Sequence, residues 1–223
     1  KLKLSEHRSS SLLDLTLRAN SLNETELLQA ALEQAEILTN SQIAYSHFVN
    51  NDQETITMGN WSAKTLQNCR SIYDNHYPIS KAGIWADCFR QKRAIICNDY
   101  PGFTQKKGLP AGHVDLLRFL SVPVMDGTEV RMIIGVGNKT EDYDESDVRE
   151  LELIGTSLWS MIKRKRGEQA LYDREHQLAL IYANVHDIVF VIKAEQNQQF
   201  RFISVNQCFI DATTLPEQQS VGK

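Results

Sequence analysis

One helical pattern runs from Asp144 to Val185, and it constrains the architecture of this chain more than any other feature. In its first half, apolar residues recur three and four positions apart, as in a helix that packs on a core. In its second half, Leu171, Leu178, Ile181 and Val185 follow coiled-coil spacing. Such a helix is too long, and its apolar stripe too narrow, to serve only as the wall of one domain. The pattern therefore predicts a helix that leaves one domain and leads to another.

Before this helix, helical and extended patterns alternate along the chain. A helical pattern runs from Ser11 to about Thr39, and within it Asn23 and Glu26 resemble the N-cap and the N3 residue of a capping box. Residues 61–80 show no regular pattern, and a short helix is predicted over residues 84–91. Strands are predicted over residues 42–49, 55–58, 94–97, 119–125 and 130–136, and turn residues join the first two and the last two as hairpins.

After the long helix, the pattern changes to short strands. Residues 188–192 and 200–205 are predicted strands, and Asn206 begins a short helical stretch. Only about 40 residues follow the long helix, which is few for an independent core. We expect these residues to pack on a neighbour or to remain poorly ordered, because half a sheet leaves an open edge.

The composition of the chain excludes several classes of function. Hydrophobic residues make up 42% of the 223 residues, charged residues make up 23%, and the net charge is −4. This balance provides no whole-chain attraction to nucleic acid or to an anionic membrane. No apolar run reaches the roughly 18 residues of a membrane helix, and the first ten residues lack the apolar core of a signal peptide. The sequence thus predicts a cytoplasmic protein without nucleic-acid binding or membrane insertion.

Metal and cofactor motifs are not apparent. The four cysteines, Cys69, Cys88, Cys97 and Cys208, have no paired spacing, so neither a zinc site nor a disulfide framework is predicted. The acidic run over residues 141–147 lacks the glycine and the closing glutamate of a calcium loop, and a capped helix N-terminus explains it better. The cofactor, if there is one, is unknown at this stage.

Three blocks in the middle of the chain resemble, in their order and spacing, the later half of a GAF domain. They read "IWADCFRQKRAIICNDY", "KKGLPAGHVDLLRFLSVPV" and "IIGVGNKTEDYDESDVRELELI". The resemblance implies an α+β fold, in which an antiparallel sheet is flanked by helices. The stretch after the long helix resembles the opening of a PAS domain and lacks the later half of that fold. The resemblance divides the chain into an N-terminal helical segment (1–19), a GAF sensory domain (20–162), a signalling helix linker (163–185) and a partial PAS domain (186–223).

Proteins built in this order resemble bacterial sensors, such as those of two-component systems, whose output is a histidine kinase or a diguanylate cyclase. The resemblance implies a non-enzymatic, small-molecule-sensing module of a signal-transduction protein. Its expected partners are an unidentified small-molecule ligand, a second copy of the chain bound through helices, and a downstream output domain. Two alternatives remain open: a dimerisation scaffold without ligand, and a thiol-dependent methionine sulfoxide reductase. The predicted placement of the cysteines in helix and strand argues against the reductase.

A polar motif near the start of the long helix also resembles part of this family. Some cyclic-nucleotide-binding GAF domains carry Asn-Lys, then Phe, then Asp-Glu, and Asn138-Lys139, Tyr143 and Asp144-Glu145 are similar here. In those relatives the lysine and the aspartate form a structural clasp. The resemblance therefore implies an ion pair between Lys139 and Asp144, and does not by itself imply cyclic-nucleotide binding.

The loop before the predicted strand at Phe119 provides two candidate ligand-binding residues. The resemblance implies that this loop covers a ligand cavity, which would place His113 and Arg118 near the ligand. The planar fork of an arginine suits a carboxylate, a phosphate or a ring edge, and a histidine adds a donor or an acceptor. The alternative is that Arg118 pairs with a carboxylate such as Asp115 while His113 is solvated.

Four more residues are candidates for the wall of the same site. They are an aromatic ring, a thiol, a carboxylate and a phenol, which together suit a small planar or cationic ligand: Trp85, Cys88, Asp99 and Tyr100. We expect His113 and Arg118 to lie on the same side of the sheet as Trp85 and Asp99, with the guanidinium of Arg118 directed inward or held at the rim of the cavity by a carboxylate. The alternative for each residue is ordinary core or a capped strand end, and it is favoured for Cys88, which has no evident activating base.

Overall fold

The computed structural model describes residues 15–68, 76–104, 114–195, 199–214 and 221. Contacts divide the chain into two compact units, residues 1–165 and residues 166–223. The predictions that concern His113 and Cys69 lie outside the described residues. Within the described parts, no helix is both long enough and apolar enough to cross a membrane.

The first unit is built on a six-stranded antiparallel sheet with the strand order β3-β2-β1-β6-β5-β4. All five predicted strands of this unit are confirmed, as are both hairpins. Strand β3 was not predicted, because three residues are too few to show alternation. The strands are β1 (Ile43–Val49), β2 (Thr55–Trp61), β3 (His76–Pro78), β4 (Ile95–Cys97), β5 (Phe119–Asp126) and β6 (Glu129–Gly137).

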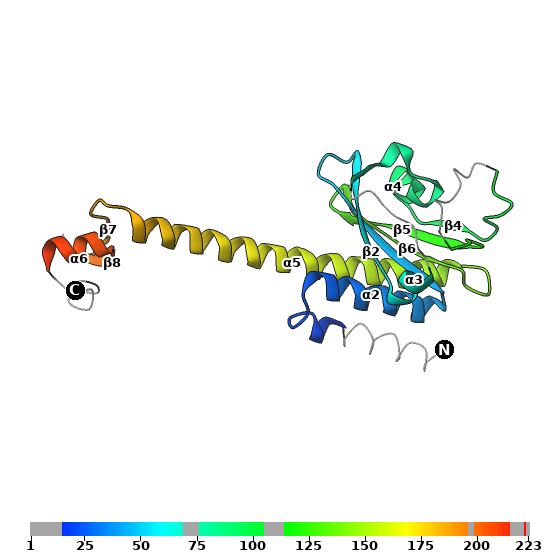
Figure 1. Cartoon of the computed structure of the whole chain (residues 1–223), viewed down its shortest axis with the longest axis horizontal. Coiled ribbons are helices and arrows are strands. Elements are labelled where there is room, and N and C mark those ends of the chain that lie inside the picture. Colours follow the sequence, from blue (N-terminus) through cyan, green and yellow to red (C-terminus); the bar gives the residue numbers. More distant parts are fainter. Residues whose placement is uncertain (1–14, 69–75, 105–113, 196–198, 215–220, 222–223) are drawn as a thin grey trace. The chain divides into compact units, whose positions relative to one another are not determined.

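Helices α2 (Glu24–Thr39) and α5 (Glu145–Asn184) cover one face of this sheet, which we call the helix face (Figure 1). The predicted capping box at the start of α2 is confirmed: the side chain of Asn23 accepts from the Glu26 amide, and the Glu26 carboxylate accepts from the Asn23 amide. Alternate residues of β5 and β6 point toward the helices and join their apolar stripes in one buried core. The strand residues of this core are Ala44, Leu120, Val122, Val124, Met132, Ile134 and Val136.

A buried carboxylate links α2 to the short helix α3 (Ala63–Asn68). Glu36 accepts hydrogen bonds from the hydroxyls of Ser62 and Thr65. Only 8% of Glu36 is exposed, and burial raises the pKa of its carboxyl group above the ordinary value. The hydroxyl of Thr65 also accepts from the amide of Ala44 on β1. This cluster therefore ties helix α2 to the sheet through polar contacts inside the core.

The opposite face of the sheet, which we call the distal face, is covered by short segments. These are the 3-10 helices η1 (Ile79–Lys81) and η2 (Ile84–Ala86) and the helix α4 (Asp87–Gln91). The predicted short helix over residues 84–91 is thus present as η2 followed by α4. Arg90 holds the segment together, because its guanidinium donates to the carbonyls of Ile79 (2.7 Å) and Ala82 (2.8 Å).

Helix α5 is anchored at the turn between β5 and β6. The carboxylate of Asp126 accepts from the indole of Trp159 (3.3 Å) and from the ammonium of Lys163 (2.8 Å). Earlier along the same helix, Gly155 lets the backbone approach the sheet closely. A methyl group at this position would lie 2.7 Å from a methyl carbon of Val124.

In the second unit, the rest of α5 is followed by β7 (Phe190–Ala194), β8 (Phe200–Val205) and α6 (Gln207–Thr213). The two predicted strands and the helix after Asn206 are confirmed. Asn206 is the N-cap of α6, accepting from the Phe209 amide, and its side chain also accepts from the Val189 amide. Every residue of β7 is exposed, including Phe190 and Ile192.

Candidate ligand-binding site

An aromatic cluster lies on the distal face, formed by Tyr45, His47, Trp61 and Trp85. Because side chains alternate along β1, Tyr45 and His47 point away from the helices, while Ala44 packs in the helix-face core. Ring centroids are 4.9 Å apart for His47 and Trp85, 5.2 Å for Tyr45 and His47, and 5.8 Å for Tyr45 and Trp61. Trp85 was a predicted site residue, whereas the other three were not. The alternation of side chains along β1 and β2 is the sequence signal that could have identified these three residues.

His47 is a neutral polar group inside this cluster. Its Nδ1 accepts from the Gly59 amide (3.1 Å), so Nε2 carries the ring proton. Burial lowers the pKa of His47 to about 4, and the imidazole is therefore uncharged at pH 7. A glycine is required at position 59, because a side-chain carbon there would lie 2.0 Å from the backbone oxygen of Ser46.

Two hydroxyl groups at the cluster make no hydrogen bond of good geometry among the described residues, although each interacts weakly with the other. They belong to Tyr45 and Ser121, and both are buried. Gly135 on β6 pairs with Tyr45 on β1 and with Ser121 on β5. The Tyr45 ring lies over Gly135, where a side-chain carbon would come within 2.3 Å of the Tyr45 hydroxyl. A buried hydroxyl without a partner lowers the stability of a protein by about 1 to 3 kcal/mol. A ligand that hydrogen-bonds to the hydroxyls in the row Tyr45, Gly135 and Ser121 would therefore be stabilised.

Cys88 lies beside the cluster as a buried thiol. Its sulfur donates to the carbonyl of Trp85 (3.5 Å), and the side chain is fully buried. Burial raises the pKa of this thiol to about 12. A thiol in this state has little nucleophilic character at neutral pH, since the thiolate is the reactive form.

Tyr100 and Asp99 belong to a neighbouring region near the start of β5. Tyr100 is buried and packs edge-on against Phe119, with ring centroids 6.0 Å apart. Asp99 is exposed, and its carboxylate accepts from the Gly102 amide (3.0 Å). The carboxylate therefore stabilises a surface turn.

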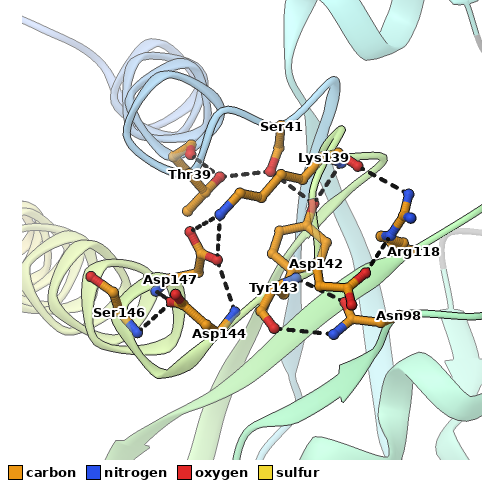
Figure 2. A network of polar contacts seen from close by, with 11 residues as sticks. Thr39, Ser41, Asn98, Arg118, Lys139, Asp142, Tyr143, Asp144, Ser146 and Asp147 are labelled. Atoms are coloured by element: carbon orange, nitrogen blue, oxygen red, sulfur yellow. Dashed lines mark hydrogen bonds and ion pairs between the residues drawn. The ribbon is translucent and has the colours of Figure 1, made fainter.

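Arg118 lies in a different cluster from Trp85. Its guanidinium donates to the carboxylate of Asp142 (3.0 Å) and to the carbonyl of Lys139 (Figure 2). The partner considered for an ordinary surface pair was Asp115, and the structure has Asp142 instead. Arg118 directly precedes Phe119, the first residue of β5, and Phe119 packs with Tyr100 on the distal face. By alternation, Arg118 points the other way, so the prediction that it shares a face with Trp85 is wrong.

A buried ion pair joins the end of β6 to the start of α5. The ammonium of Lys139 lies 2.7 Å and 2.9 Å from the two carboxylate oxygens of Asp147 (Figure 2). The implied pair between Lys139 and Asp144 is therefore wrong. Asp144 precedes the first residue of α5, and its carboxylate instead accepts from the amides of Ser146 and Asp147. Asp147, one turn further along, faces inward and is free to meet the lysine.

Hydroxyl groups extend this ion pair toward α2. The hydroxyl of Tyr143 accepts from the Lys139 amide and lies 2.8 Å from the hydroxyl of Ser41, which lies 2.7 Å from that of Thr39. Thr39 in turn donates to the carbonyl of Ala35. The network in Figure 2 thus connects the end of α2 with the start of α5. Its groups satisfy one another, which indicates a structural role.

Charged groups are absent from the aromatic cluster within the described part of the chain. On the covering segments, the charged side chains of Asp87 and Arg90 pair with each other. Among the described residues, no group of three or more His, Cys, Asp or Glu side chains could hold a metal ion. The cluster therefore offers aromatic surface and neutral hydrogen-bonding groups.

Comparison with known proteins gives both family and fold relatives. A family model described as GAF domain matches residues 21–163. The methyl sulfide methyltransferase-associated sensor of Methanosarcina acetivorans is 35% identical over 202 residues, which are 89% of this chain and 19% of that protein. The chain thus spans about a fifth of the length of this relative.

Among solved structures, the GAF domain of a phosphoenolpyruvate-protein phosphotransferase from Coxiella burnetii matches with a TM-score of 0.61 and 15% identity. The match covers 73% of this chain and 96% of that one. Free methionine-R-sulfoxide reductase from Neisseria meningitidis matches with a TM-score of 0.57 and 9% identity, covering 72% of this chain and 91% of that one. At these identities the likeness concerns the fold alone.

Proposed function

Because the chain belongs to the GAF domain family, we propose that it is a small-molecule-sensing module of a signal-transduction protein. The observation that carries this proposal is the aromatic cluster on the distal face, with the buried, unpartnered hydroxyls of Tyr45 and Ser121 beside it. The sensor name of the relative from Methanosarcina acetivorans supports the same function. Trp85, at the edge of the cluster, is the predicted site residue that we place in contact with the ligand.

The remaining predicted site residues have different places in this proposal. Cys88 lies in the buried core against which Trp85 packs. Asp99, Tyr100, Arg118 and His113 stay predictions as ligand contacts. For Arg118, a ligand would have to replace Asp142 as the partner of the guanidinium.

The sheet provides a physical connection between ligand and output. Strands β1, β5 and β6 carry distal-face residues and helix-face residues in alternation. A ligand that binds better to one arrangement of these strands shifts the population toward that arrangement. Helices α2 and α5 pack directly on the other side, so their packing would follow. In a homodimer, this change becomes a shift in helix pairing.

The proposal is tested by native mass spectrometry of the protein purified from its own host. We expect a retained small molecule to appear as added mass, and we expect Trp85→Ala to lower the occupied fraction. Trp159→Ala is the matched control, because Trp159 packs on the helix face. The absence of bound mass in every preparation of a dimeric protein would favour the scaffold without ligand.

We expect the chain to form a homodimer through α5. Leu171, Leu178 and Ile181 are all more than half exposed, and in coiled-coil spacing such residues pair with a second helix. Light scattering at micromolar concentration should give the mass of a dimer, and Leu178→Asp should shift it toward the monomer. Ala179→Asp adds the same charge beside the seam and should leave the dimer intact. A monomeric mass for the unmodified chain would contradict the expectation.

We expect no thiol-dependent reduction of free methionine sulfoxide. Burial raises the pKa of the Cys88 thiol to about 12 and also raises that of Cys97, so neither forms a thiolate readily. Turnover with a thiol reductant should stay at the background rate, and Cys88→Ser and Cys97→Ser should not change it. A robust rate that disappears in either variant would establish the reductase alternative.

For the second unit, we propose that residues 186–223 are the opening part of a PAS domain. The antiparallel pair β7 and β8, followed by α6, supports this assignment. Apolar side chains on both strands are exposed, among them Phe190 and Phe200. Such a surface needs further strands or a partner to cover it. We also propose that the module regulates a downstream output domain of the histidine kinase or diguanylate cyclase type.

A further inference from the structure

We infer that the ligand of the distal face is an uncharged, planar molecule that hydrogen-bonds to the hydroxyls of Tyr45 and Ser121. This inference rests on the proposed function and specifies the chemical class of its ligand. Three properties of the aromatic cluster support it: the arrangement of its rings, its two buried hydroxyls and the absence of unpaired charge among its described residues.

The rings provide surfaces for a flat molecule. Tyr45 and His47 are buried, whereas Trp61 and Trp85 are partly exposed, so the two indole rings are the part of the cluster that a ligand meets first. Trp85 meets Tyr45 and His47 edge-on, at interplanar angles of 83° and 64°. Aromatic rings favour such edge-on or offset contacts, and a planar guest can extend the same pattern.

The hydroxyls provide the specific contacts. Both are buried and unpartnered among the described residues, and both lie in the row across Gly135. Burial raises the pKa of the Tyr45 phenol well above its ordinary value, so this group stays protonated and can donate. A third unpartnered hydroxyl, that of Ser46, points to the helix face, where the neighbouring side chains are aliphatic. It lies outside the cluster and provides a control.

Among its described residues, the cluster offers no unpaired charge to an ionic ligand. His47 is neutral, and Asp87 and Arg90 are paired with each other. An anion bound here would lose its hydration without gaining a counter-ion among the described residues, which is costly in a buried site. A permanent cation could stack on the indole rings, but one without donors or acceptors would leave the two hydroxyls without a ligand partner. A neutral molecule with one polar group meets neither cost.

The test uses the complete chain labelled with 5-fluorotryptophan, followed by fluorine NMR. The protein has three tryptophans, of which Trp61 and Trp85 lie in the cluster and Trp159 packs on the helix face as an internal reference. The probes are phenol, benzoate and tetramethylammonium. We expect phenol to shift the Trp61 and Trp85 resonances in a saturable manner and to leave that of Trp159 in place. Benzoate and tetramethylammonium should shift none of them.

Two variants test the hydroxyl contacts. Tyr45→Phe and Ser121→Ala should each weaken phenol binding about five- to tenfold, the equivalent of one neutral hydrogen bond. Each variant should change the stability of the free protein by at most about 1 kcal/mol, because neither hydroxyl makes a hydrogen bond of good geometry there. Ser46→Ala removes an unpaired hydroxyl from the other face of the sheet and should leave phenol affinity unchanged.

The outcomes separate this inference from the proposed function. Saturable shifts with benzoate or tetramethylammonium instead of phenol would overturn the ligand class, and a sensing role would stand. Phenol shifts that are equal in all four proteins would overturn the hydroxyl contacts. If no probe moves either resonance, the inference is wrong, and native mass spectrometry then decides whether the chain retains a ligand of another class.

Discussion

Replacing Lys139 with alanine is expected to lower the free energy of unfolding by about 3 to 5 kcal/mol, because it leaves the buried carboxylate of Asp147 without its cation. The side chains of Lys139 and Asp147 are only 14% and 8% exposed. The same carboxylate also accepts from the Asp144 amide at the start of α5. The substitution therefore removes the ion pair and also weakens the N-terminus of α5. Urea denaturation followed by circular dichroism measures it.

The pair between Arg118 and Asp142 is the matched control. It lies in the same region, but Asp142 is 70% exposed. Arg118→Ala should therefore cost less than about 1 kcal/mol, as is usual for pairs at the surface. Equal losses for Lys139→Ala and Arg118→Ala would contradict the structural role that we assign to the buried pair.

Acidification from pH 7 to pH 4 is expected to remove about 3 kcal/mol of stability through His47 alone. Burial lowers the pKa of His47 to about 4 in the folded protein, from an ordinary value of 6.5. The unfolded chain therefore binds the proton more readily than the folded one within this window. The contribution is fully present above the unfolded pKa and is lost as the pH falls toward the folded pKa.

Unfolding free energies measured across this range test the assignment. His47→Gln keeps a polar side chain that can accept from the Gly59 amide, and it removes the titration. Its stability should depend less on pH than that of the unmodified chain. The ring protons of His47 should also keep the shifts of a neutral imidazole down to pH 5. A midpoint near 6.5 in the NMR titration would show that the ring is not held in the neutral form.

Local patterns predicted most of the fold. The capping box of Asn23 and Glu26, and the turn over residues 126–128, depend on neighbouring residues, so they can be identified without tertiary information. Strand β3 and helix α3 could not be predicted in this way, because the conformation of such short segments depends on their tertiary contacts. The site was predicted less well for the same reason. Tyr45 and His47 alternate along a predicted strand, but only the folded chain shows that η2 brings Trp85 to that face.

The polar motif before α5 shows the same limit at the level of single residues. Asp144 and Asp147 have identical side chains three positions apart, and either could pair with Lys139 on the basis of spacing. The choice depends on which carboxylate is occupied by backbone amides at the helix start and which one points inward. That is a property of helix geometry and not of composition. The partner of Arg118 was missed in a similar way, because Asp142 lies on a loop that only folding brings near.

The buried Glu36 gives the fold an internal compensation against acid. Its raised pKa means that the folded protein favours the protonated carboxyl, so its contribution is present below the ordinary pKa of 4.5 and is lost as the pH rises through the folded value. His47 acts with the opposite sign, because its contribution is lost as the pH falls toward 4. Within the pH range in which both groups titrate, the stability lost through His47 on acidification is partly offset by the stability gained through Glu36. The hydroxyls of Ser62 and Thr65 donate to this carboxyl and lower its pKa, so they limit the compensation while they stabilise the carboxylate inside the core.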